Sequence, residues 1–131
     1  MRVTLSLAAM CTMSFVLPAW AHHSHGNYAP TPKDIEGVVK EIHFIVPHSW
    51  VYLDVKDANG QPQTWVVEAT GKSQLEKIGV TGDYIKLGDT VKGRCHPLRD
   101  GTNGCLLGFL KARDGSVKDW DGGNAPAPKD F

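Results

Sequence analysis

The sequence predicts a mainly β domain, a small five-stranded barrel of the OB type with one short helix between its third and fourth strands. Runs rich in β-branched and aromatic residues alternate with Gly, Asn and Pro turn signals. The hydrophobic period lengthens at residues 73–78, a further helical turn could follow at residues 81–87, and two more strand-like runs come after them. Three strands, a helix and two strands is the order of a Greek-key OB barrel. An open antiparallel sheet with one helix packed on it is the alternative.

The first three strands are expected at residues 35–46, 49–56 and 63–69. Each run is short and rich in Val, Ile, Trp or Tyr, which favours strands. Asn59-Gly60 lies between the second and third runs and is a strong hairpin signal. The three strands should therefore form an antiparallel meander.

The helix is expected at residues 73–78, where apolar positions lie three apart. Ser73 is expected to cap it, with Glu76 as its capping-box partner. The last two strands are expected at residues 90–96 and 105–113.

Residues 1–21 have the parts of a secretory signal peptide. Arg2 supplies the positive charge, a short apolar run follows, and Ala19-Trp20-Ala21 is a small-residue cleavage pattern. The apolar run is shorter than the roughly 20 residues that a bilayer requires, so no stable membrane insertion is expected after cleavage. A periplasmic or secreted protein is expected, with His22 as its first mature residue.

The rest of the chain divides by composition. Residues 22–33 are polar and are expected to form a flexible, His-rich arm. Residues 34–113 hold the barrel domain, and residues 114–131 are expected to form a loose tail in which Trp120 and Phe131 could dock. The chain has 14 basic and 14 acidic residues. Without a basic excess to neutralise phosphates, a nucleic-acid partner is not expected.

Two cysteines, Cys95 and Cys105, remain after signal removal. An even number in an exported protein favours a disulfide. A turn at residues 99–101 would place the two side chains opposite each other on paired strands, within disulfide reach. The alternative is a metal or redox site that also uses His96, although the CxxC spacing is absent.

The histidines near the cleavage site are the sharpest chemical signal. A mature chain that begins at His22 has an α-amine and an imidazole that can chelate together, and both donors suit Cu(II), Ni(II) and Zn(II). The α-amine loses its proton near neutral pH, so a metal can displace that proton. The leading hypothesis is an exported transition-metal-binding protein, with copper as the expected cofactor. Its candidate ligands are His22, His23, His25 and His48. The alternative is that this histidine-rich N-terminus is a soluble, disordered segment that binds metals only adventitiously.

A second hypothesis rests on aromatic residues. Alternation along the second strand places Trp50 and Tyr52 on the face opposite Val51. That outer face is the usual binding surface of an OB barrel. With Trp65 and Glu68 of the third strand, these aromatics are the candidate ligand-binding residues of a metal-free accessory module. Its partner would be a small molecule or another exported protein, unless the arm or the tail covers the face.

His48 follows Pro47 at the start of the second strand and should lie at the barrel rim. It could pair with Glu68 as an acid and base, which would suit a small hydrolase or isomerase. The favoured alternative is that the His48 imidazole bonds a loop carbonyl and holds the strand start, while the Glu68 carboxylate is solvated or bonded to a loop. Because the sequence carries no nucleophile or phosphate-loop motif, binding is expected rather than catalysis.

Several motifs occur together in this chain. They are His22-His23-Ser24, Pro47-His48-Ser49-Trp50, residues 65–68 and Leu87-Gly88-Asp89-Thr90-Val91. In these motifs the chain resembles an uncharacterised family of small exported bacterial proteins, known only as a domain of unknown function. The likeness covers most of residues 22–113, but the family usually has Asn where this chain has Val46. The resemblance implies an exported, single-domain, β-rich protein and implies no activity.

Overall fold

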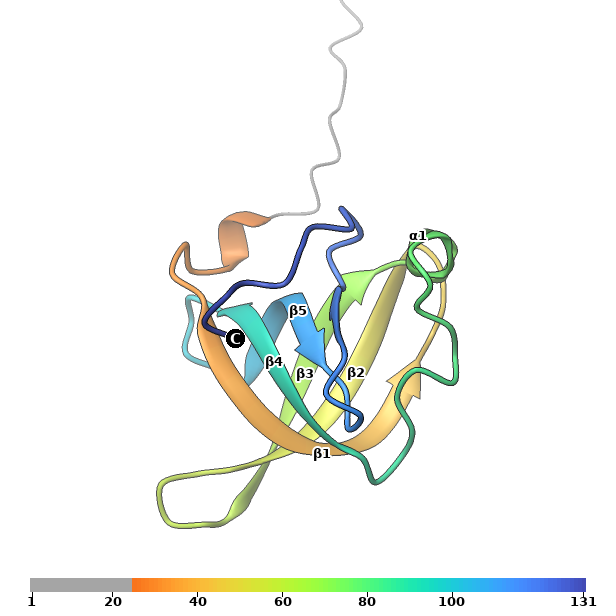
Figure 1. Cartoon of the computed structure of the whole chain (residues 1–131). Coiled ribbons are helices and arrows are strands. Elements are labelled where there is room, and N and C mark those ends of the chain that lie inside the picture. The colour runs from red at the N-terminus through yellow and green to blue at the C-terminus, as the bar shows by residue number, and fades with distance from the viewer. Residues whose placement is uncertain (1–24) are drawn as a thin grey trace, which may run out of the picture.

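The computed structural model describes residues 25–131, and its first five strands close into a barrel (Figure 1). The strand order is β3-β2-β1-β4-β5-β6, and a further β3–β5 pairing closes the cylinder. The β3–β5 pairing is parallel, whereas the other strand pairs are antiparallel. The OB-like prediction is confirmed and the open sheet is not found. The elements are a 3-10 turn His25–Asn27, β1 Lys33–His43, β2 His48–Lys56, β3 Pro62–Thr70, α1 Lys72–Lys77, β4 Thr90–Pro97, β5 Gly104–Lys111 and β6 Val117–Asp119.

Strand β1 is strongly curved and shared between two neighbours (Figure 1). Its first half pairs with β4, from Lys33 opposite Cys95 to Val38 opposite Thr90. Its second half pairs with β2. Gly37 lies at the changeover, where an added Cβ would be 2.7 Å from the carbonyl oxygen of residue 54. Only glycine permits this close approach of two backbones.

The barrel interior is filled by alternate residues of each strand. Val51 and Leu53 of β2 are fully buried, as their alternation predicts. Leu75 of α1 is also fully buried, so the short helix contributes to the same core. Burying these side chains is the main favourable term in folding.

The predicted helix cap is wrong. Helix α1 begins one residue earlier than expected, and Gly71 is its N-cap without any side-chain capping bond. Ser73 therefore lies inside the first turn, where it cannot serve as the N-cap of a capping box with Glu76. A glycine is required at the cap because an added Cβ at Gly71 would lie 2.9 Å from the carbonyl carbon of Pro47.

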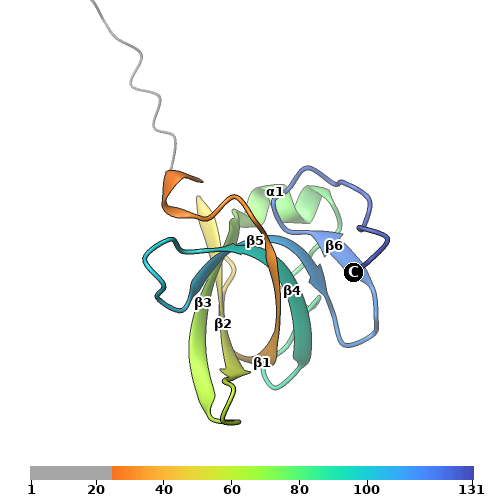
Figure 2. The same ribbon diagram turned by 90° about the vertical axis from the view of Figure 1, so that its left-hand side faces the viewer.

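The expectation of a loose tail is wrong for its central part. Residues Val117–Asp119 form β6, which pairs with the edge of β5. Trp120 is 1% exposed, and its backbone N–H donates to the Gly108 carbonyl at 2.7 Å. Its large apolar ring packs into the core, which fixes the segment. Figure 2 shows β6 and the final residues lying along the β4–β5 side of the barrel.

The described part of the N-terminal arm is also held in place. Residues 25–27 form a 3-10 turn, and the Ala29 N–H donates to the Pro97 carbonyl at 2.8 Å. The signal peptide and the histidines at positions 22 and 23 lie outside the described residues. Within residues 25–131, no helix is both long and apolar enough to cross a membrane.

Candidate functional site

A cluster of three polar side chains lies on the outer face of the barrel. His48 Nδ1 is 2.7 Å from Glu68 Oε1, and the Tyr28 hydroxyl donates to Glu68 Oε2. Both oxygens of one carboxylate are thus engaged, by side chains from β2 and from the N-terminal segment. The geometry brings His48 and Glu68 together, so the expectation of a solvated or loop-bonded Glu68 carboxylate is wrong.

The register of β2 and β3 brings His48 and Glu68 together. Trp50 is directly opposite Glu68, and His48 is opposite Thr70. His48 and Glu68 are therefore diagonal neighbours on one face of an antiparallel pair, a spacing that long side chains can bridge. His48 is the first residue of β2, at the barrel rim as expected.

The loop before His48 is fixed from two sides. The Lys72 N–H donates to the Ile45 carbonyl at 2.9 Å, which ties the loop to the start of α1. The buried Ser49 hydroxyl donates to the same carbonyl at 3.4 Å. The Val46–Pro47 peptide bond is cis. The site histidine therefore emerges from a well-supported turn.

Tyr28 is the residue that sequence reasoning missed. It forms a bridge with Leu98, and Arg99 Nε donates to its carbonyl at 2.9 Å. These contacts fix the segment across the β4–β5 loop and direct the phenol toward β3. A single tyrosine in a polar arm carries no local motif, so only the long-range contact with Glu68 reveals its role.

Burial is the main cause that raises the pKa of the Tyr28 phenol. The hydrogen bond to Glu68 and the nearby negative charge raise the pKa further. The phenol therefore keeps its proton at physiological pH and acts as a hydrogen-bond donor. Its place in the cluster is to hold the carboxylate, which in turn faces the imidazole of His48.

The described residues do not complete a metal centre. In residues 25–131, no group of three or more His, Cys, Asp or Glu side chains is placed to hold a metal ion. His48 and Glu68 are two candidate donors at one place. The other predicted ligands are His22 and His23, which lie outside the described residues, and His25, whose side chain is not described.

The predicted aromatic set divides between the two faces of the sheet. Trp50 and Tyr52 are half-buried on the outer face, and the Tyr52 ring lies 5.5 Å from the ring of His43. Glu68 shares this face because it is opposite Trp50. Trp65 does not join them, since it is opposite Leu53 and packs against the core.

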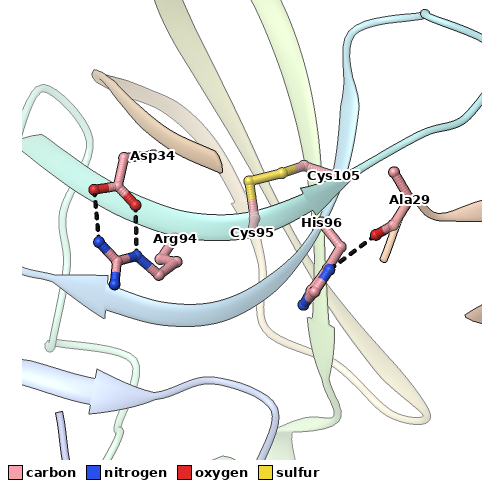
Figure 3. Close-up of a disulfide and its surroundings, with 6 residues drawn as sticks. All are labelled: Ala29, Asp34, Arg94, Cys95, His96 and Cys105. Atoms are coloured by element: carbon pink, nitrogen blue, oxygen red, sulfur yellow. Dashed lines mark hydrogen bonds and ion pairs between the residues drawn. A yellow bond between two sulfur atoms is a disulfide. The ribbon is translucent and has the colours of Figure 1, made fainter. Parts of the chain in front are cut away.

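The structure joins Cys95 and Cys105 as a disulfide with a Cα–Cα distance of 5.6 Å (Figure 3). Both residues are buried, at 0% and 1% exposure. His96 turns away from them, because its Nδ1 bonds the Ala29 carbonyl at 2.9 Å (Figure 3). These three residues therefore do not form the alternative metal or redox site.

Comparison with known protein families identifies the family to which the chain belongs. Residues 10–107 match a family of unknown function (DUF6152). The chain belongs to this family. The resemblance to an uncharacterised domain family is thus confirmed, and membership in DUF6152 assigns no activity. No curated protein matches the chain.

Two solved structures resemble this chain at low sequence identity. The mitochondrial single-stranded DNA-binding protein Rim1 of S. cerevisiae is 12% identical, with a TM-score of 0.48, over 63% of this chain and 92% of Rim1. A ZRD-deleted mutant of TiaS in complex with agmatine is 14% identical, with a TM-score of 0.48, over 68% of this chain. The match spans 26% of that TiaS chain.

Proposed function

We propose that this DUF6152 protein is an exported binding protein for a transition metal, copper(II) foremost. The metal would be held between the histidines of the mature N-terminus and His48 on the barrel. The observation that supports this most directly is the shared carboxylate of Glu68, which receives Tyr28 from the N-terminal segment and His48 from β2.

The contact of Tyr28 with Glu68 supports a role for the histidines that precede it in the sequence. His25 precedes Tyr28 by three residues, so its backbone lies within about 10 Å of that of Tyr28. His22 precedes it by six residues, a span of at most about 20 Å. Because Tyr28 and His48 meet on one carboxylate, these chain lengths would allow imidazoles of the segment to bind a metal together with His48.

Glu68 would orient the barrel ligand. With Nδ1–H donating to the carboxylate, Nε2 would be the nitrogen through which His48 binds the metal. A carboxylate behind a ligating histidine fixes the ring and raises its basicity. The His48 and Glu68 side chains are 25% and 15% exposed, so the pair is partly shielded from competing water.

The donor set favours copper over magnesium or calcium. An α-amine and several imidazoles are nitrogen donors of intermediate softness, whereas magnesium and calcium prefer oxygen. Within the Irving–Williams series, such a set binds Cu(II) more tightly than Ni(II) or Zn(II).

Calorimetric titration of the processed protein with Cu(II) tests this proposal. We expect one copper per chain and an electron paramagnetic resonance spectrum typical of several nitrogen ligands. Glu68→Gln should weaken binding about tenfold, the usual cost of losing a partner behind a histidine ligand. Tyr28→Phe should also weaken binding, because it releases the segment from Glu68.

The matched controls separate the barrel ligand from the N-terminal chelate. His48→Gln should lower copper affinity, whereas His43→Gln should not, since His43 contacts Glu41 and Tyr52 instead of Glu68. Adding one residue before His22 should also weaken binding by removing the α-amine from the chelate. Copper affinity that is unchanged in both His48→Gln and the extended chain would refute the proposal.

The second candidate is an accessory module that binds a small molecule or an exported protein through Trp50 and Tyr52. It is supported by their shared, half-buried outer face on β2. A partner would change tryptophan fluorescence in a way that a chelator does not reverse. If Trp50→Ala leaves that change intact, this face is not the binding surface.

A further inference from the structure

The barrel has a cavity of about 480 Å³ where its strands separate. Strand β1 pairs with β2 only from Val38 onward, so its first residues diverge from the far end of β2. Strand β3 pairs with β5 only from Val66 onward, so its start is also separated from β5. The cavity lies between these diverging segments and has the size of a small-molecule site.

Trp65 forms the aromatic wall of this cavity. It lies on the core side of β3 and is half-buried against the hydrophobic core, which fixes its ring. The ammonium of exposed Lys33 lies 4.7 Å from the ring centroid. This face of the ring is therefore covered by the ammonium of an exposed side chain, which a ligand would have to displace.

The polar lining carries both signs of charge and both hydrogen-bonding roles. Lys33 and Lys56 supply donors, and Glu36 supplies an acceptor. The amides of Gln63 and Asn103 supply both roles, although Gln63 Nε2 already donates one hydrogen bond at 3.4 Å to the lining carboxylate of Asp57. The nearby carboxylate of Asp34 is already engaged, since Arg94 holds both of its oxygens (Figure 3). Because the lining carries charges of both signs, it favours neither an anionic nor a cationic ligand.

We infer that this cavity binds a neutral, polyhydroxylated ligand, a short saccharide. The apolar C–H face of a sugar ring would stack on Trp65, because aromatic faces favour such contacts. Its hydroxyl groups both donate and accept, which matches the mixed lining. Lys33 would move from the ring face and donate to a ligand hydroxyl instead.

This site is separate from the proposed metal cluster. His48 is the first residue of β2, whereas Lys56 is the last. On β3, Trp65 and Glu68 are about 10 Å apart along the strand, and they lie on opposite faces of the sheet. Saccharide binding should therefore be independent of copper and of the N-terminal histidines.

Saturation-transfer NMR with maltotriose and chitotriose tests the inference on the full mature chain. We expect saturable binding of at least one sugar, unchanged by copper. Trp65→Leu should lower the affinity about tenfold, and the matched variant Trp50→Leu on the outer face should not change it. Because Trp65 also packs against the core, Gln63→Ala at an exposed position is the second variant, and it should lower affinity several-fold.

Three results would overturn this inference. The first is the absence of saturable binding for both sugars at millimolar concentration. The second is binding that survives both Trp65→Leu and Gln63→Ala in folded variants. The third is binding of choline at Trp65 in preference to either sugar, which would identify a cation site.

Discussion

Reducing the disulfide between Cys95 and Cys105 should destabilise the barrel by an amount that follows from its position. The two cysteines are separated by 10 residues. In the chain-entropy description, a closed loop of that size removes unfolded-state freedom equivalent to about 2.7 kcal/mol at 25 °C. For a small domain, this is a large share of a total stability of roughly 5–15 kcal/mol.

Urea unfolding followed by circular dichroism measures this effect on oxidised and reduced protein. With a denaturant slope of about 1–3 kcal/mol/M, the midpoint should fall by roughly 1–3 M on reduction. Because both sulfurs are buried, the reduced sample should be prepared by unfolding, reduction and refolding. The double variant Cys95→Ala/Cys105→Ala is the control, and its midpoint should not respond to reductant.

Equal midpoints for the oxidised and reduced protein would refute this reasoning. That result would mean that the loop closed by these cysteines contributes no constraint to the unfolded chain. A reductant response in the double alanine variant would show that the effect arises elsewhere.

Three further outcomes follow from packing and charge. Gly71→Ala should lower stability by about 1–3 kcal/mol, since its Cβ would meet the Pro47 carbonyl, whereas Gly82→Ala has open space and should have little effect. Thermal unfolding of the two variants measures this difference in stability. Asp34 has its pKa lowered to about 2, chiefly by hydrogen bonds from the β4 arginine, so its stabilisation is complete above about pH 4 and is lost as pH falls toward 2. Urea midpoints across this range should converge for wild type and Asp34→Asn. Trp120→Ala should cost about 3–5 kcal/mol, and a melt unchanged by it would contradict the docked tail.

The barrel could be predicted because its signals are local. The alternation of Val51 and Leu53 places them in the core, and the change in period at the helix identifies the Greek-key order. The exact start of α1 could not be predicted, because it depends on the contact between Gly71 and Pro47 across a loop. The docking of Trp120 depends similarly on the space left by the other strands.

The cluster was only partly predictable. The pairing of His48 with Glu68 follows from strand register, so a meander with correct bounds suffices to suggest it. Tyr28 was not predictable, since its partner Glu68 is distant in sequence and only the anchored N-terminal segment brings them together. Trp65 does not lie with the outer aromatics as expected, and its alternation with Glu68 along the third strand already indicates the opposite face.

The division of β1 between β2 and β4 has a consequence for assembly during synthesis. The hairpin of β2 and β3 can form early. The β1–β4 pairing, in which Lys33 is opposite Cys95, forms only after β4 has been synthesised. The β3–β5 pairing, in which Val66 is opposite Gly104, likewise requires β5. A nascent chain therefore cannot seal its cylinder until nearly all of it has emerged. Such late, long-range pairing slows folding, so the polypeptide stays unfolded for longer after its synthesis.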